Sequence, residues 1–290
     1  MDDLIINFSP TGMVPSKDMV PHVPLSPNEI IEEVHAAYEV GITMVHLHAR
    51  DEITGEPTYK ASVYQKIIEG LRQHCPDLVL CASLSGRLWN EFEKRSEVLE
   101  LKPDMGSLTL GSINFNRQAS VNTPEMIQKL AKKMLDYGVK PELEVFDFGM
   151  LNYAKYLIEK KLLQPPYYFN LLTGNVAGMQ AELAQIGLAI KELPPNSYWA
   201  LAGIGDAQLT ANTLAIATGG GVRFGLEDNI YFDKKRKVLA TNIAVLKRIH
   251  AIADIFERKL MPSKKFGHLG FYNSQRVGKT NETLSHRGAE

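Results

Sequence analysis

The sequence has little cysteine, no excess of either charge and no long apolar run. Its only cysteines, Cys75 and Cys81, make no zinc-finger spacing and fit a reducing cytosol. The 32 basic and 33 acidic side chains nearly cancel, so charge gives no reason to expect a nucleic acid or an anionic membrane as partner. No window reaches the roughly 20 apolar residues that a membrane span needs, and no signal-like segment opens the chain. We therefore expect a soluble, cytoplasmic protein.

Short apolar runs alternate with longer amphipathic segments along the chain. Eight such pairs occupy roughly 260 residues, which is the usual size of a (β/α)8 barrel. The sequence therefore predicts a TIM barrel, with a doubly wound open sheet as the structural alternative. The expected strands are Leu4 to Phe8, Thr43 to His48, Leu78 to Ser83, Met105 to Leu110, Glu142 to Phe146, Tyr168 to Leu172, Tyr198 to Ala202 and Val222 to Phe224.

Two segments fall outside this alternation. The first loop, residues 9–24, carries four prolines, and we expect it to form a stiff flap. Residues 262–290 lack periodicity but contain an apolar cluster that a free tail would expose to water. We expect residues 1–261 to form the catalytic barrel and residues 262–290 to form an extended C-terminal arm that contacts a neighbouring subunit or is partly disordered. The apolar cluster consists of Phe266, Leu269, Phe271 and Tyr272.

A histidine pair, His46 and His48, stands near the end of the second expected strand. Because strand side chains alternate between faces, both imidazoles point the same way. A turn follows at Thr54-Gly55, so the pair lies at a strand end, where barrel enzymes keep their chemistry. The pattern favours two ligands of one metal ion. The alternative is one histidine in the core and one at the rim.

A catalytic zinc site needs three protein ligands and one open position, and Glu227 offers the third ligand. Glu227 and Asp228 come just after the eighth expected strand, which contains Arg223. Strands two and eight have the same parity in a barrel, so their inward side chains share layers and Glu227 can face the histidine pair. The alternative is that the two acids cap the last helix.

Three other strands also carry polar side chains near their ends. Hydroxyl groups can hydrogen-bond a bound carboxylate, and an arginine can pair with it. Ordinary explanations exist, because Ser85-Gly86 is typical of a turn and Glu144 inside a barrel needs a buried lysine or arginine to remain charged. The candidates are Ser83, Ser85 and Arg87 after the third strand, Ser107 and Thr109 in the fourth, and Glu144 in the fifth.

Three motifs in this order resemble the β-keto acid cleavage enzyme family, and the match runs over nearly the whole chain. They are residues 45–51 (VHLHARD), 107–115 (SLTLGSINF) and 223–228 (RFGLED). The resemblance implies a zinc-dependent (β/α)8 barrel, typically a homotetramer, that converts a β-keto acid and acetyl-CoA into acetoacetate and a new CoA thioester. It further implies attack of a carbanion on acetyl-CoA, CoA transfer and retro-Claisen cleavage.

The resemblance also assigns roles to single residues. His46, His48 and Glu227 resemble the zinc ligands of the family. Asp228 resembles its general base, and Arg223 resembles the electrostatic partner of that base. A carboxylate near the α-carbon can take a proton, and an adjacent arginine keeps that carboxylate ionised and oriented.

For two residues of the family motifs, this sequence offers more than one matching position. Ser83 and Ser85 compete for the family serine after the third strand, and Ser107 and Thr109 both match the family threonine. The lysine-fermentation member of the family uses an acid in its first loop to hold a substrate amino group, but residues 11–15 (TGMVP) supply no acid here. The apolar Met13, Val14, Met19 and Val20 of the first loop favour an uncharged or apolar substrate side group over a cationic one.

Two other functions fit the metal-ligand pattern. A zinc hydrolase would activate water on the metal and use Asp228 or Glu227 as the base, without CoA. A non-catalytic metal-binding barrel would act as a scaffold or sensor. Consumption of acetyl-CoA by the purified protein distinguishes β-keto acid cleavage from these two functions.

Overall fold

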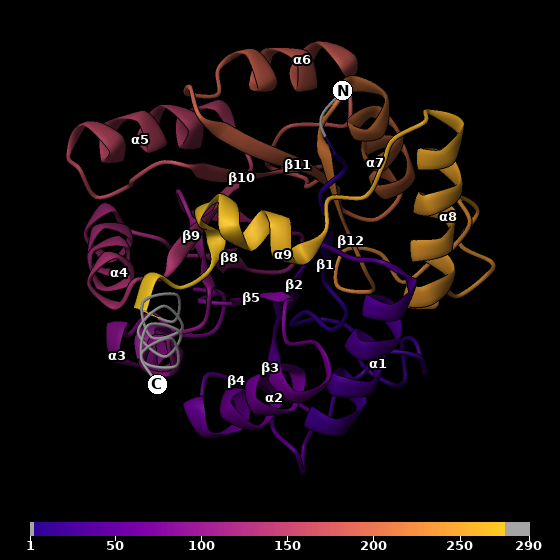
Figure 1. Cartoon of the computed structure of the whole chain (residues 1–290), viewed down its shortest axis with the longest axis horizontal. Coiled ribbons are helices and arrows are strands. Elements are labelled where there is room, and N and C mark those ends of the chain that lie inside the picture. Colours follow the sequence, from indigo (N-terminus) through magenta and orange to yellow (C-terminus); the bar gives the residue numbers. More distant parts are fainter. Residues whose placement is uncertain (1–2, 276–290) are drawn as a thin grey trace, which may run out of the picture.

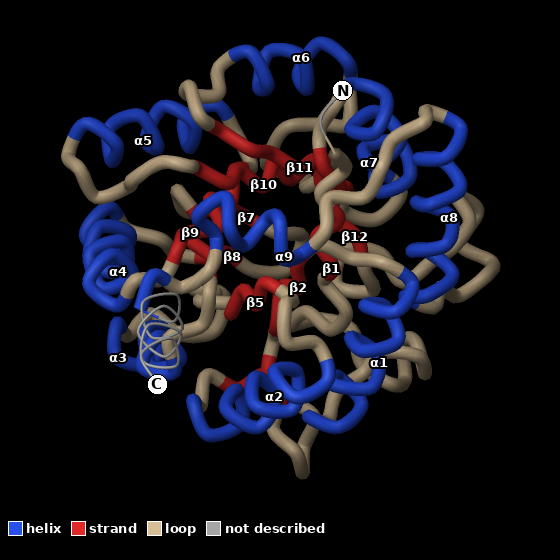
Figure 2. The backbone as a smooth tube through the Cα atoms, in the orientation of Figure 1, coloured by secondary structure: helices blue, strands red, loops and turns tan. Residues whose placement is uncertain are grey.

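The computed structural model, which describes residues 3–275, shows a closed barrel of eight parallel strands surrounded by helices (Figures 1 and 2). The predicted (β/α)8 barrel is confirmed, and the expected strand ends differ from the observed ones by at most two residues. The ring closes because β1 pairs with both β2 and β12. The barrel strands are β1 (Ile6–Phe8), β2 (Met44–Leu47), β5 (Val79–Ala82), β6 (Met105–Thr109), β9 (Lys140–Val145), β10 (Tyr167–Thr173), β11 (Ser197–Gly203) and β12 (Gly221–Phe224).

A helix follows each barrel strand and lies outside the ring (Figure 2). Apolar side chains of these helices and of the turn after α3 pack against the ring. The first helix starts where the sequence indicates, with a capping box in which Ser26 Oγ accepts from Glu29 N and the Glu29 carboxylate accepts from Ser26 N. The helices are α1 (Pro27–Val40), α2 (Ala61–His74), α3 (Phe92–Ser96) with the 3-10 turn η1 (Glu97–Leu101), α4 (Pro124–Tyr137), α5 (Phe148–Glu159), α6 (Leu183–Lys191), α7 (Ala207–Thr218) and α8 (Asn242–Ile255).

Two short hairpins interrupt the loops that follow β2 and β6. One pairs β3 (Ala49–Arg50) with β4 (Pro57–Thr58), and the other pairs β7 (Ile113–Asn114) with β8 (Ala119–Ser120). Both belong to the loops at the carboxyl ends of the barrel strands, the end that we call the mouth. Within residues 3–275, none of the helices combines the length and the apolar composition needed to cross a membrane.

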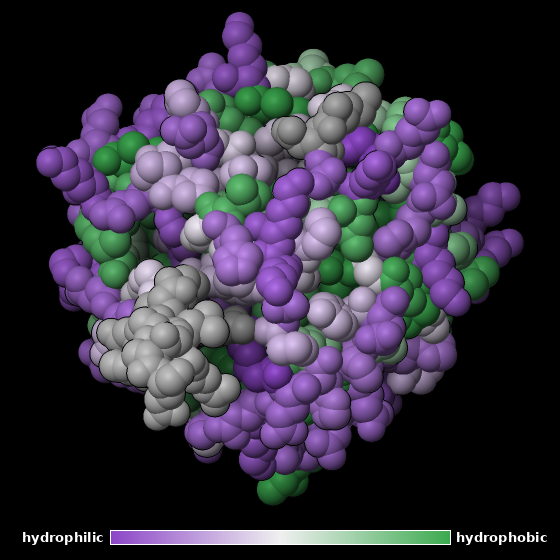
Figure 3. Space-filling view, in the orientation of Figure 1, coloured by the Kyte–Doolittle hydropathy of each residue, from purple (hydrophilic) through white to green (hydrophobic). Residues whose placement is uncertain are grey.

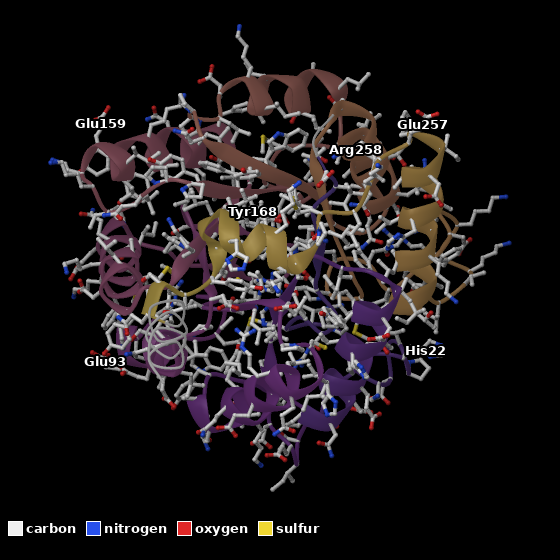
Figure 4. The ribbon with its side chains drawn as sticks, viewed as in Figure 1. His22, Glu93, Glu159, Tyr168, Glu257 and Arg258 are labelled. Carbon is white, nitrogen blue, oxygen red and sulfur yellow. The ribbon has the colours of Figure 1, made fainter. Side chains whose placement is uncertain are left out.

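The opposite end of the barrel is closed by the C-terminal segment. After α8 the chain returns beneath β1, where Leu4 N donates to Lys259 O at 2.7 Å. The short helix α9 (Ser263–Phe266) and the π-helical turn η2 (Gly267–Phe271) then lie across this end (Figure 1), with Tyr168 beside α9 (Figure 4). Figure 3 shows hydrophilic side chains where α9 crosses this face.

Phe266 and Phe271 fill this end of the barrel interior. Their rings stack with centroids 4.2 Å apart, both meet Tyr168 nearly edge-on, and both side chains are fully buried. The apolar cluster of the C-terminal segment therefore packs on the chain's own barrel, and our expectation that it docks on a neighbouring subunit is wrong for these residues. Sequence periodicity could not show this, because the hollow that they fill exists only once eight strands have closed. Residues 276–290 of the expected arm lie outside the described residues.

The substitution Phe271→Ala should lower the free energy of unfolding by about 3–5 kcal/mol, because it removes a fully buried aromatic side chain and leaves a cavity. Urea unfolding followed by circular dichroism measures this change. Ile255→Ala is the matched control, since Ile255 is 78% exposed and its truncation should change the stability by less than about 0.5 kcal/mol. Equal stability of the two variants would show that η2 is not part of the folded core.

Candidate active site

Three potential metal ligands converge at the barrel mouth. His46 lies in β2 and His48 directly after it, and their Nε2 atoms are 3.2 Å apart. Glu227 Oε1 is 3.1 Å from Nε2 of His48 and 4.0 Å from Nε2 of His46. The other oxygen, Glu227 Oε2, is buried and has no hydrogen-bond partner among the described residues. The group that sequence periodicity predicts is thus brought together, and one metal ion would satisfy all three side chains.

Glu142 of β9 supports the histidine pair from inside the barrel. Burial would raise the pKa of Glu142, but His46 and Arg223 lower it to about 2. The ionised carboxylate lies 2.6 Å from Nδ1 of His46, so Nδ1 carries a proton and donates a hydrogen bond to the carboxylate. Nε2 is therefore the nitrogen that His46 presents to His48 and Glu227, an arrangement in which a carboxylate fixes the orientation of a metal-binding histidine.

Glu142 has three further partners, and all of them are buried. Asn7 Nδ2 and Asn170 Nδ2 donate to Oε1 at 2.6 and 3.2 Å, and the Cys81 thiol donates to Oε2 at 3.2 Å. Burial, together with the charge of Glu142, raises the pKa of Cys81 well above its usual range, so the thiol keeps its proton. Sequence reasoning missed Glu142, although Glu142 and Glu144 repeat the two-residue spacing of the histidine pair.

Arg223 of β12 joins the acids of the mouth. Its guanidinium is 2.8 Å from Glu227, 3.2 Å from Glu144 and 3.2 Å from Asp228, and its side chain is 2% exposed. Burial would lower the pKa of Arg223, but Asp228, Glu227 and the other carboxylates raise it well above its usual range. Arg223 is thus the buried cationic partner that the sequence analysis requires for Glu144.

Asp228 has the properties of a general base. Burial raises the pKa of Asp228 to about 6, although Arg223 pulls the pKa down. Its carboxylate accepts from Arg223 Nε at 3.2 Å, which fixes its orientation beside the histidine and glutamate cluster. A buried carboxyl with a pKa near neutrality, held at a barrel mouth, is typical of a group that accepts a proton during catalysis.

Ser83, Ser85 and Arg87 lie in the loop after β5. Both serines line a cleft that also contains His48. Ser85 Oγ accepts from Arg87 N at 3.3 Å, which is the turn bond expected of Ser85-Gly86. The Arg87 guanidinium carbon lies 3.8 Å from the ring centroid of Phe115, and Arg87 Nε is buried without a hydrogen-bond partner among the described residues. This unpaired guanidinium N–H can donate a hydrogen bond to an anionic group of a ligand.

The structure gives Ser107 and Thr109 different partners. Ser107 Oγ accepts from Leu84 N at 3.0 Å and so holds the loop after β5. Thr109 Oγ1 donates to Glu144 Oε2 at 2.6 Å and so holds a carboxylate of the mouth. Both hydroxyl groups thus position other parts of the site.

The first loop is fixed against the site by Arg50, a residue that sequence reasoning did not single out. Arg50 Nε donates to the carbonyl oxygen of Gly12, and Arg50 Nη2 donates to the carbonyl oxygen of Pro15, both at 3.0 Å. Gly12 has a φ of +66°, and a Cβ there would lie 2.6 Å from Cγ of Glu227. Because any larger residue would meet Glu227, this glycine lets the flap close directly over the potential metal ligand.

The chain is similar to known proteins in both sequence and structure. A family model described as beta-keto acid cleavage enzyme matches residues 3–266. The chain is 35% identical over 262 residues to a 3-keto-5-aminohexanoate cleavage enzyme of Fusobacterium nucleatum, covering 90% of this chain and 94% of that protein. It is 33% identical over 257 residues to a 3-oxoadipate:acetyl-CoA acetyltransferase of Cupriavidus necator, covering 88% and 89%. A complex of ObcA with oxaloacetate has the same fold, with a TM-score of 0.73 at 19% identity over 87% of this chain and 68% of that one.

Replacing one of the potential metal ligands should abolish metal binding, whereas replacing Glu142, which orients His46, should only weaken it. We expect His46→Ala and Glu227→Gln to lose a bound divalent metal, because each removes one of three ligands. Glu142→Gln should bind the metal about 10–100-fold more weakly, because His46 loses its orienting carboxylate. Metal content after dialysis against graded chelator measures both effects, with the exposed Glu125→Gln as control. Near-stoichiometric metal in His46→Ala and Glu227→Gln would exclude this cluster as the site.

Proposed function

Because this chain belongs to the β-keto acid cleavage enzyme family, whose reaction depends on acetyl-CoA, we propose that it uses zinc to convert a β-keto acid and acetyl-CoA into acetoacetate and a new acyl-CoA. One observation carries the proposal. At a single barrel mouth, the ligand cluster of His46, His48 and Glu227 meets Asp228 through the shared guanidinium of Arg223.

The ligand cluster fits zinc. Two imidazoles and one carboxylate form a three-ligand set that is common in catalytic zinc sites, where a fourth position stays open for substrate. Glu227 Oε2, buried without a partner among the described residues, is an acceptor that a cation would complete. When bound here, zinc supplies a Lewis acid that stabilises enolate charge on a substrate ketone oxygen.

The protein's own groups supply the proton transfer. Asp228 takes a proton from the α-carbon of the β-keto acid, while Arg223 keeps the carboxylate oriented and favours its ionised form. The resulting carbanion attacks the carbonyl carbon of acetyl-CoA, and the CoA thiolate that leaves is transferred to the ketone carbon of the β-keto acid. Retro-Claisen cleavage then releases the new acyl-CoA and the acetoacetate carbanion, which takes back the proton from Asp228. Glu144, held by Thr109, completes the buried charge cluster around Arg223.

The loop after β5 is the place for the substrate carboxylate. Arg87 offers unpaired guanidinium donors, and Ser83 and Ser85 line the adjoining cleft next to His48. Burial lowers the pKa of Arg87, whereas the charges of Glu227 and Glu144 raise it. The Arg87 guanidinium therefore interacts electrostatically with the acids of the mouth. We assign Arg87 and Ser83 to the carboxylate, with Ser85 and Ser107 shaping the loop that carries them.

The cleft beside His48 indicates the character of the substrate side group. It is lined by Met13 of the first loop and by Tyr59 and Trp89, whose rings meet edge-on with centroids 5.3 Å apart. No carboxylate occurs among the described residues that line it. A substrate with a cationic side group would therefore lose its hydration here without gaining a partner.

The two cationic residues of this cleft are already engaged. Lys94 forms an ion pair with Glu91 at 2.6 Å. Arg95 donates to Leu84 O at 3.0 Å and to Asn122 Oδ1 at 2.7 Å. We therefore propose an apolar, uncharged side group. On family resemblance we also propose a homotetramer, and on the cysteine content a cytoplasmic location.

Asp228→Asn should lower turnover by a factor of roughly 10² to 10⁴, because the amide is nearly isosteric but cannot accept the proton. The measurement is acetyl-CoA consumption over a panel of β-keto acids. Zinc content should stay the same, which separates loss of the base from loss of the metal. Wild-type turnover in this variant would place the base elsewhere. A wild-type protein that acts on its substrate without consuming acetyl-CoA would instead support a zinc hydrolase, and metal binding without any turnover would support a scaffold.

Three six-carbon β-keto acids test the side group. 3-Oxohexanoate should react with a kcat/KM at least about tenfold above those of 3-keto-5-aminohexanoate and 3-oxoadipate, because only its side group is uncharged. Met13→Glu should shift the preference toward the aminated substrate, and Met13→Gln, of similar size but neutral, should not. Preference of the wild type for either charged substrate would contradict an apolar side-group site.

A further inference from the structure

A hairpin of unusual charge follows the acid pair of the mouth. Between β12 and α8 the chain forms an antiparallel bridge from Tyr231 to Leu239, and we call residues 231–239 the basic hairpin. Its tip carries the run Lys234 to Lys237, which is exposed. Within residues 3–275, Lys234, Lys235 and Lys237 have no ion pair. In a chain whose net charge is −1, this is a strong local concentration of positive charge.

The basic hairpin is held in one conformation despite this repulsion. The Asp233 carboxylate accepts from the backbone N–H groups of Lys237 and Val238 at 2.9 and 2.7 Å. Arg236 makes a two-bond ion pair with Asp206 of the neighbouring mouth loop, at 3.0 and 3.1 Å. The only other cation of the run is thus used to fix the hairpin, and the three lysine ammonium groups stay available at its tip.

The position of the hairpin links it to the proposed chemistry. It begins three residues after Asp228, whose carbonyl accepts from Gly205 N at 2.8 Å and so joins the last two mouth loops. The six residues from Asp228 to Lys234 span at most about 20 Å. In barrel enzymes the loops after the seventh and eighth strands are a frequent site for phosphate groups.

We propose that the basic hairpin binds the phosphate groups of the nucleotide end of CoA, through Lys234, Lys235 and Lys237. This inference rests on the proposed function, in which acetyl-CoA is the co-substrate. The nucleotide end of CoA carries several negative charges, whereas its acetyl end must reach the cluster at the mouth. The pantetheine arm spans the interval between them. Lys17 and Lys94, which also lie near the mouth, are less suited because they pair with glutamates.

A solvated run of surface charge is the ordinary alternative, and binding measurements distinguish the two. Isothermal titration calorimetry with CoA, adenosine 3′,5′-bisphosphate and pantetheine reports binding independently of turnover. The triple variant Lys234→Ala/Lys235→Ala/Lys237→Ala should bind CoA and the bisphosphate at least about tenfold more weakly, because exposed charge pairs each contribute a few-fold. Its affinity for pantetheine, which lacks the nucleotide, should be unchanged. Raising the salt concentration should weaken CoA binding more in the wild type than in the variant.

The matched control removes three lysines from the other end of the barrel, with Lys191→Ala/Lys259→Ala/Lys264→Ala, so that net charge changes equally. CoA affinity within about twofold of the wild type is expected for this control. If the hairpin variant also stays within twofold, or if both variants weaken equally, the basic hairpin is not the phosphate site. If the wild type binds no CoA and consumes no acetyl-CoA with any β-keto acid, the proposed function fails together with this inference.

Discussion

The site depends on one buried cation. The Arg223 guanidinium binds Glu144, Glu227 and Asp228 at once, and all three carboxylates lie at the barrel mouth with little access to water. Three acids at this spacing would otherwise repel each other and take up protons. Removing one partner of such a buried ion pair typically costs about 3–5 kcal/mol, because the remaining charge is uncompensated. Arg223 therefore lowers the pKa of Glu227 and of Asp228 and favours their ionised forms.

The closed barrel makes this arrangement possible and gives each end of the interior a different task. Closure of the ring through β1 brings the strand that carries Arg223 near the strand that carries His46. Toward the mouth the inward side chains are polar, and Glu142 connects His46 to the amide groups of Asn7 and Asn170. Toward the other end they are apolar and meet α9 and η2. The stacked and buried rings of Phe266 and Phe271 thus fill the end of the barrel that lies opposite the charged side chains.

The residues that we propose for side-group recognition lie in the mouth loops, whereas His46, Glu142, Glu144 and Arg223 lie in the barrel strands. Arg50 donates hydrogen bonds to the backbone of the first loop on both sides of Met13. Met13 therefore lines the cleft from a backbone segment that is held in place. The loop after β5 adds Trp89 to the same cleft. The loop after β12 contains the basic hairpin, which lies outside this cleft. Relatives named for an aminated and for a dicarboxylic β-keto acid share a third of the sequence with this chain. Changes confined to loops are sufficient to alter a side-group pocket while leaving Asp228 and Arg223 in place.

The sequence by itself determined the alternation of eight strands and helices and the shared face of His46 and His48, because both are properties of neighbouring residues and their period. The RFGLED motif likewise pointed to Glu227 and Asp228 as acids that follow a strand. Only the tertiary structure decided that Glu142 lies beneath His46 and that one arginine serves three acids, since these contacts depend on the register between strands far apart in the chain. The C-terminal segment shows the same limit. Its apolar residues carry no period, and the hollow that receives them is created by barrel closure rather than by any local pattern.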